Sequence, residues 1–347
     1  NLAYGFEWRE ETYTAIAGEA TSYSNADGSI GAGSSGFKGI TPQDSGKFSR
    51  DNYAVYVDIE HDVNADWLMQ YAVRYEDFSD FGGTLNWKVA GNYSLSDDTS
   101  LRAAISTGFH APTPGQSNVR TTITTFDGTT GLQIEEGLIP ATDPRAIAAG
   151  GQAIKEEESL NFSAGFVSNI TDYTSITLDF YKIEVDDRIY RTGDIGQPDG
   201  STISFYTNAI DVEHSGIDLV ISSEFEWSSS TTTDVNFVYS YNKVEVAGQR
   251  QVSGIQPVSD ATVEDIENNY PNNRFVLSAN TVFSDQWNLL LRANYYGTHY
   301  DERGTIGAET NPSKEIDAVV YVDAELTYQY SENTAIKFGL MNMFDEY

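Results

Sequence analysis

The side chains of this sequence that could recognise a ligand gather in the long segments between its strand-like stretches. Small-molecule sites combine amphipathic aromatic rings with polar groups, because the ring supplies apolar surface and the polar groups fix orientation. Asp260, Glu264, Asp301 and Glu302 share these segments with several such rings. We predict ligand contacts at Tyr23, Phe37, Phe126, Tyr270, His299 and Tyr300.

Catalytic and metal-binding motifs are missing from the sequence. It has no Gly-x-Ser-x-Gly, no His-Glu-x-x-His and no phosphate-binding glycine loop before a helix. His61, His110, His214 and His299 are too far apart in sequence to form a ligand pair. The acidic segment 259–267 lacks the order of an EF-hand Ca²⁺ loop, so we expect a solvated loop there. We expect a protein that is not an enzyme, with no cofactor and no metal.

Composition narrows the class of protein. The chain carries 52 acidic and 20 basic side chains, a formal charge of −32 that would repel a phosphate backbone, so we expect no nucleic-acid partner. The absence of cysteine excludes a disulfide scaffold and thiolate metal sites. The 22 Tyr, 17 Phe and 29 Gly are typical of strands and turns. These counts predict an all-β protein.

The elements that would position the candidate ligand contacts are strands with a period of two. Val55, Val57 and Ile59, for example, alternate with Asp58 and Glu60. No stretch reaches the roughly 18 apolar residues of a membrane helix, but barrel strands alternate lipid-facing and lumen-facing residues. We therefore expect the apolar parity to face lipid and the charged parity to face inward. About thirteen strands are predicted, through residues 4–13, 53–60, 67–76, 85–95, 101–105, 160–166, 176–180, 217–221, 235–241, 275–279, 287–295, 320–328 and 336–340.

Two kinds of connection alternate between these strands. Short polar turns, such as 64–66 and 284–286, alternate with segments that are mostly long, such as 110–156 and 247–272. This sidedness is typical of an antiparallel transmembrane β-barrel of the outer membrane. The first and last strands both run toward the long segments, so their number is odd. Because an open sheet edge cannot face lipid, we expect that at least one returning strand is missing.

Five segments carry a family resemblance. They are Leu101–Thr113, with His110 in place of the usual arginine of a Gly-Phe-Arg-Ala-Pro type motif; Glu157–Phe166; Leu178–Ile183; Tyr206–Ala209 with Ser215–Leu219; and Met341–Tyr347, which is similar to an Asn-Leu-Phe-Asp motif before a final strand. Together they resemble the C-terminal half of the barrel of TonB-dependent transporters from the outer membrane of Gram-negative bacteria.

The resemblance implies a 22-stranded barrel closed by an N-terminal plug that contacts the TonB energy-transducing complex. Residues 1–347 would then be one part of the barrel domain, without the plug and without the final strand. The implied function is TonB-driven uptake of a scarce, bulky nutrient such as a metal chelate, a vitamin or an oligosaccharide. The implied partners are outer-membrane lipid, that ligand and, through the absent plug, TonB.

Two other functions remain open from the sequence. A passive general porin of about sixteen strands fits the chain length better, and its acidic lumen would prefer cations. A soluble all-β carbohydrate-binding protein would explain the many Tyr and Trp residues. The porin does not explain the motifs, and the soluble protein does not explain the alternation of short and long connections.

Overall fold

The computed structural model describes residues 1–347 except 25–37, 127–132, 199, 253, 255, 303 and 347, and for residues 122–126, 133–135 and 285 it describes the backbone alone. Within the described residues thirteen strands form one antiparallel sheet, each paired with the next along the sheet. They are β1 (Leu2–Ala15), β2 (Gly46–Asp62), β3 (Trp67–Phe78), β4 (Gly82–Ser96), β5 (Thr99–His110), β8 (Glu157–Thr171), β9 (Thr174–Arg191), β12 (Tyr206–Ser228), β13 (Thr231–Gln249), β14 (Asn273–Phe283), β15 (Trp287–Tyr296), β18 (Val319–Ser331) and β19 (Thr334–Leu340). The predicted all-β class and the thirteen strands are confirmed.

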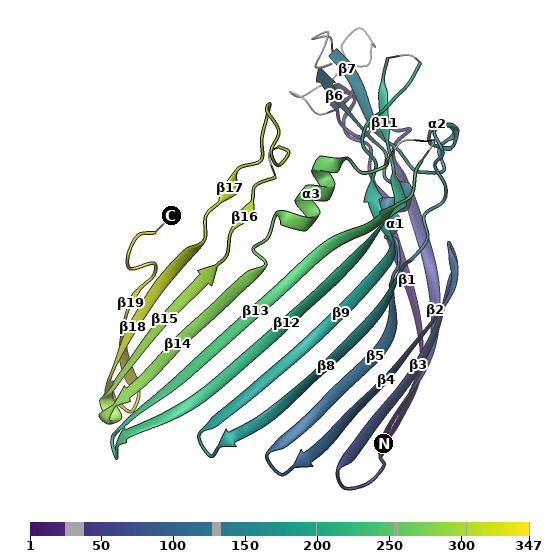
Figure 1. Cartoon of the computed structure of the whole chain (residues 1–347). Coiled ribbons are helices and arrows are strands. Elements are labelled where there is room, and N and C mark those ends of the chain that lie inside the picture. Colours follow the sequence, from purple (N-terminus) through teal and green to yellow (C-terminus); the bar gives the residue numbers. More distant parts are fainter. Residues whose placement is uncertain are drawn as a thin grey trace.

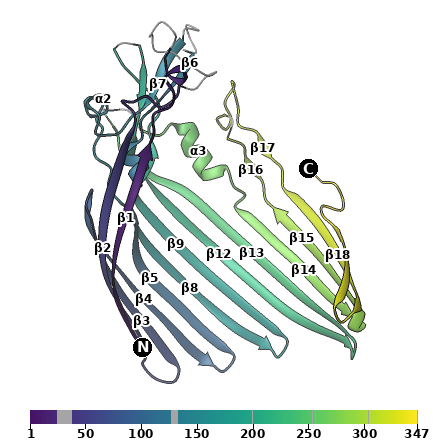
Figure 2. The same cartoon turned by 180° about the vertical axis from the view of Figure 1, so that it is seen from behind.

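The sheet has two different rims. Figures 1 and 2 show a curved sheet with tight turns along its lower rim and the longer connections along its upper rim. Four residues join β2 to β3 and two join β4 to β5, whereas residues 111–156 separate β5 from β8. The predicted alternation of short turns and mostly long segments is confirmed, and residues 79–81 form a short connection at the long-loop rim.

The two faces of the sheet differ in exposure as the period of two requires. On β2, Tyr53 and Val55 are 54% and 51% exposed, whereas the intervening Asn52 and Ala54 are 2% and 1% exposed. The apolar side chains of each strand are therefore exposed to solvent in the isolated chain. The side chains on the opposite face pack against their polar neighbours. We call these the apolar face and the polar face.

Side chains on the polar face reach across whole strands. Arg102 of β5 donates to Asp179 of β9 at 2.8 Å, over Gly165 of the intervening β8. Tyr181 of β9 donates to Asn242 of β13 at 3.2 Å, over Gly216 of β12. A Cβ atom at either glycine would collide with the side chain that crosses it. Such contacts between next-nearest strands need a face on which side chains converge, as on the inner side of a barrel.

A second, four-stranded sheet covers part of the long-loop rim. It has the order β10-β11-β7-β6, from β6 (Thr121–Phe126), β7 (Gln133–Leu138), β10 (Ile195–Gly196) and β11 (Thr202–Ser204), and α1 (Pro114–Asn118) and α2 (Pro144–Ala148) lie in the same connections. Its core holds the fully buried Phe205 and Ala146 together with Ile139 and Ile203. The sequence predicted no strands here, because their apolar residues are few and become a core only when two connections meet. We call these connections, 111–156 and 192–205, the loop cap.

Arg50 joins the loop cap to the main sheet. The side chain is 6% exposed, donates from Nε to Glu11 at 2.8 Å and donates to the backbone oxygen of Pro112. Its guanidinium also lies 5.1 Å from the centre of the Phe78 ring. A buried guanidinium needs this many partners, because an unpaired charge is costly away from water.

The remaining long connections carry α3 (Asp260–Asn268) and the short pair β16 (His299–Tyr300) and β17 (Glu315–Ile316), beside the shorter η1 (Ala20–Ser22) and η2 (Ser284–Gln286). The prediction of a solvated loop at 259–267 is therefore wrong. Ser259 accepts a hydrogen bond from Thr262 N at 3.1 Å and caps the helix. Val263 and Ile266 pack against the buried cluster of Ala209, Ile210, Val212 and Val258. In the described part of the chain no helix is long and apolar enough to cross a membrane.

Candidate ligand pocket at the long-loop rim

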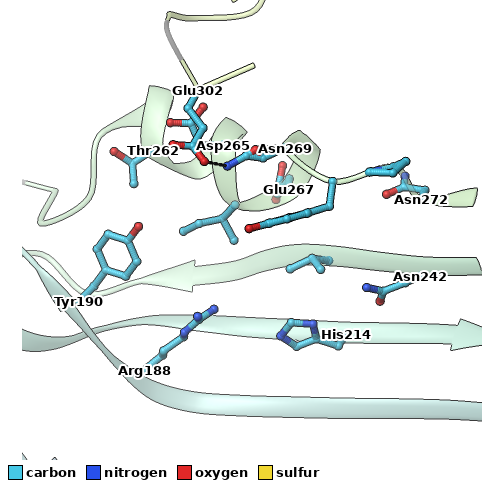
Figure 3. A pocket seen from close by; sticks show the side chains of 14 residues that line it. Arg188, Tyr190, His214, Asn242, Thr262, Asp265, Glu267, Asn269, Asn272 and Glu302 are labelled. Carbon is cyan, nitrogen blue, oxygen red and sulfur yellow. Dashed lines mark hydrogen bonds between the residues drawn. The ribbon is translucent and has the colours of Figure 1, made fainter. Parts of the chain in front are cut away.

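A cavity of about 480 Å³ lies between α3 and the polar face of the main sheet. Figure 3 shows its two walls, with side chains of β9, β12 and β13 below and those of α3 and the following residues above. The volume falls in the range typical of small-molecule sites, roughly 300–1,000 Å³. The lining residues are Arg188, Tyr190, His214, Asn242, Val244, Thr262, Asp265, Ile266, Glu267, Asn269, Tyr270, Pro271, Asn272 and Glu302.

The sheet wall depends on local irregularities of the strands. The pairing of β9 with β12 shifts between Asn208 and Val212, and Asp187 has a φ of 60°. An extra residue of this kind bends a strand and changes the direction of the side chains beyond it. On β13, Asn242 is fixed from two sides, by the Tyr181 hydroxyl and by the hydrogen bond of its own N–H to Asn272 O at 2.9 Å.

The helix wall follows from the spacing of residues in α3. Val263 and Ile266 face the sheet and join an apolar cluster with Val244 and Val246. Thr262, Asp265 and Asn269 also line the cavity. Positions three and four apart lie on one side of a helix, so this wall places one polar row next to the apolar one.

The helix wall carries an excess of negative charge. Burial raises the pKa of the Asp265 carboxyl above its ordinary value of 3.8, and three nearby carboxylates raise it further. These are Glu302, Glu264 and Asp301. Within the described residues no ion pair joins Asp265, Glu264 or Glu302 to a basic side chain.

Backbone and amide groups hold the neighbouring acids instead. Glu302 accepts from Asn269 Nδ2 at 2.8 Å, Glu264 accepts from Ile306 N at 2.7 Å, and Glu267 accepts from Val246 N at 2.8 Å. These bonds tie α3 to the β15–β18 connection and to β13. Asn269 Oδ1 is buried and has no hydrogen-bond partner in the described part of the chain.

The six predicted contact residues do not gather in one site. Tyr270, 74% exposed, lines the cavity. His299 and Tyr300 form β16, which lies next to α3 but outside the lining, and Tyr23 follows η1 and is half-buried. Phe37 lies outside the described residues, and of Phe126, at the end of β6, only the backbone is described. Their role as ligand contacts stays a prediction.

Sequence reasoning missed most of the lining. Of the four acids that it placed beside the aromatic rings, Glu302 lines the cavity, and Glu264 is outside the lining and accepts from Ile306 N. Arg188, His214 and Asn242 come from three different strands, and nothing in their sequence neighbourhoods connects them. The polar parity of β12 and β13 was a usable signal for His214 and Asn242, because it placed both on the inward face.

The described residues contain no group of three or more His, Cys, Asp or Glu side chains that could hold a metal ion. The arrangement suits binding, because it combines two tyrosines, amides, one guanidinium and carboxylates around a cavity.

Comparison with known proteins agrees with this geometry. The family model described as TonB dependent receptor-like, beta-barrel, matches residues 1–343. The chain belongs to this family. The receptor barrel is 22% identical over 298 residues to the vitamin B12 transporter BtuB of Photobacterium profundum, an alignment that covers 86% of this chain and 40% of that protein. The resemblance predicted from the five motifs is confirmed.

Solved structures share the fold of the receptor barrel. A mutant of the ferric enterobactin receptor PfeA from Pseudomonas aeruginosa matches with a TM-score of 0.68 at 15% identity, over 99% of this chain and 46% of that one. The siderophore receptor PirA from Acinetobacter baumannii matches with a TM-score of 0.69 at 14% identity, over 99% and 48%. The receptor barrel thus spans less than half the length of these relatives, which are transporters and receptors rather than enzymes.

Proposed function

We propose that this receptor barrel takes part in TonB-driven uptake of a scarce, bulky nutrient across the outer membrane of a Gram-negative bacterium. The nutrient binds at the long-loop rim, and energy from the TonB complex drives its release inward. The membership of the chain in the TonB-dependent receptor-like family supports this function. So does the likeness to a B12 transporter and to siderophore receptors.

The observation that carries the proposal is the position of the cavity. It lies on the polar face, at the rim with the long connections, and helix α3 forms one of its walls. A solute that arrives from outside meets this rim first if the short turns face the periplasm, as in outer-membrane barrels. The apolar face would contact outer-membrane lipid.

The proposal also concerns the rest of the receptor. Thirteen strands leave the edges of β1 and β19 without partners in the described sheet, and such edges are not stable in lipid. We therefore treat residues 1–347 as one part of a barrel that further strands close. A plug domain would contact the polar face and would itself bind TonB.

An uptake comparison tests this function. Solutes that disappear from a complex medium are measured for the parent strain, for a strain without this gene and for a strain without TonB. Energised uptake predicts at least one solute that only the parent depletes. A passive porin, the competing hypothesis, would deplete it equally without TonB, and that result would contradict the proposal. Membrane fractionation checks the location separately.

A further inference from the structure

The two walls of the ligand pocket have opposite hydrogen-bonding character. On the helix wall, the carboxylates of Asp265 and Glu302 act only as acceptors when ionised. Asn269 holds the Glu302 carboxylate in place from its Nδ2 at 2.8 Å, so the acceptor on this wall has a fixed position.

The sheet wall supplies donors. The Arg188 guanidinium, which carries N–H groups and no acceptor, forms no ion pair or side-chain hydrogen bond within the described residues. The Oδ1 atom of Asn242 accepts from the Tyr181 hydroxyl, which leaves its Nδ2 group as a donor for the cavity. The sheet wall also carries His214 and the Tyr190 hydroxyl, which can donate or accept, so a ligand meets donors on this wall and carboxylate acceptors on the helix wall.

The chemistry of the two walls separates ligand classes. A hydroxyl group both donates and accepts, so a polyhydroxylated ligand satisfies both walls at once. A polyanionic chelate presents mainly acceptors and would meet Asp265 and Glu302 in a chain whose formal charge is −32. A polyamine presents only donors and would meet the charge of Arg188. Tyr190 and Tyr270 add aromatic surface against which the apolar faces of sugar rings pack.

We propose that this pocket binds an uncharged, hydroxyl-rich ligand of the oligosaccharide class and discriminates against polyanionic metal chelates. The inference rests on the proposed function, since it names the ligand of the same site. The names of the structural relatives describe receptors for siderophores, which are a different ligand class. Their likeness does not contradict the inference, because a shared fold at 14–15% identity does not determine the ligand.

Direct binding tests the ligand class. The whole protein that the gene encodes, purified in detergent, is applied to an array of neutral, uronate-containing and amino oligosaccharides, and is titrated with a ferric tricatecholate. We expect binding to neutral oligosaccharides above all other probes. Binding to no neutral oligosaccharide, or a preference for the uronates or the ferric complex, would overturn the inference.

Matched variants place the binding in this pocket. Tyr270→Ala and the pair Asp265→Asn with Glu302→Gln should each weaken binding of the best neutral oligosaccharide by about tenfold. Tyr173→Ala and Asp172→Asn, at the short-turn rim, should leave it unchanged. Tighter binding after the two acids are neutralised would mean an anionic ligand and would contradict the inference, as would equal losses in the control variants.

The two proposals fail in different ways. If a ferric chelate is taken up with TonB dependence and Tyr270→Ala abolishes its uptake, the function stands and the ligand class is wrong. If neutral oligosaccharides bind in the pocket but depletion of the medium does not depend on TonB, the ligand class stands and the energised function is wrong.

Discussion

Two clusters of long connections stand on the same rim of the sheet, and they are stabilised in different ways. The loop cap has a core around the fully buried Phe205 and pairs its acids with arginines, as Asp143 with Arg120 at 2.7 Å and Glu136 with Arg191. The connection with α3 has, in its described residues, no fully enclosed core of its own. It lays Val263 and Ile266 on the polar face of the sheet and brings acids together with backbone and amide partners.

The difference separates a scaffold from a recognition surface. Paired charges and a closed core occupy most polar groups of the loop cap, although the buried Glu156 Oε2 and Thr202 Oγ1 have no hydrogen-bond partner among the described residues. What distinguishes the connection with α3 is a cavity whose lining acids and Arg188 form no ion pair among the described residues. Low local stability and open polar groups are characteristic of segments that bind ligands and move.

The strongest test of this comparison removes apolar contacts from each cluster. Phe205→Ala should destabilise the loop cap by about 3–5 kcal/mol, because the side chain is fully buried and leaves a cavity. Ile266→Ala, on the half-buried face of α3, should cost about 1–2 kcal/mol. Hydrogen exchange of segments 192–205 and 260–268 measures both local opening free energies. Equal losses in the two variants would break the comparison.

A second test concerns the sheet from which both clusters rise. Leu289 lies on the apolar face of β15 and its neighbour Asn288 on the polar face, opposite Leu326 and Thr327 of β18. An arginine that faces the middle of the bilayer costs roughly 2–4 kcal/mol. Leu289→Arg should therefore impair barrel assembly more than Asn288→Arg, as heat-modifiable gel mobility measures. If both variants assemble equally well, the apolar face does not face lipid and neither cluster borders a lumen.

The sequence was sufficient for the main sheet because each strand carries its own signal. Alternation such as Tyr53, Val55 and Val57 against polar neighbours is local and needs no partner strand for its detection. The short turns could be predicted equally well, because polar turn residues interrupt the alternation. The number of strands and the two rims followed from these signals together.

The loop elements and the pocket could not be predicted from the sequence in the same way. The apolar residues of α3 that pack are Val263 and Ile266, in a mostly acidic segment. The helix is stabilised because both pack against the buried cluster that contains Ile210 and Val258. Arg188 and Asn242 line one cavity only because the register of β9, β12 and β13 brings them together. Such long-range packing leaves no periodic trace in the chain. Tyr270 was predicted as a ligand contact because a ring beside acids in a long connection suits a binding site; it lines the cavity, and its role as a contact stays a prediction.

The smallest expected effect, and the most diagnostic one, is a difference of sign in the pH response of two carboxylates, Asp143 at the start of α2 and Asp265 in α3. Asp194 of the loop cap does not share the sign of Asp143, because burial and the nearby Glu136 raise its pKa above 3.8. Burial works to raise the pKa of Asp143, but the backbone N–H of Arg145 and the guanidinium of Arg120 outweigh it, so the folded pKa lies below 3.8. The stability from this carboxylate is fully present above pH 3.8 and is lost as the pH falls through the folded pKa. For Asp265 burial and neighbouring acids raise the folded pKa above 3.8, so ionisation there opposes folding.

Acidification from neutral pH should therefore tighten α3 as Asp265 takes up its proton, and only below pH 3.8 should it loosen α2 as Asp143 does the same. Hydrogen exchange of segments 144–148 and 260–268, corrected for the intrinsic rate at each pH, measures the two responses. Asp265→Asn should abolish the tightening of α3 without affecting α2, and Asp143→Asn should abolish the loosening of α2 alone. If protection of α3 falls steadily between neutral pH and about pH 4, its acids stabilise the folded connection, and the contrast with α2 is wrong.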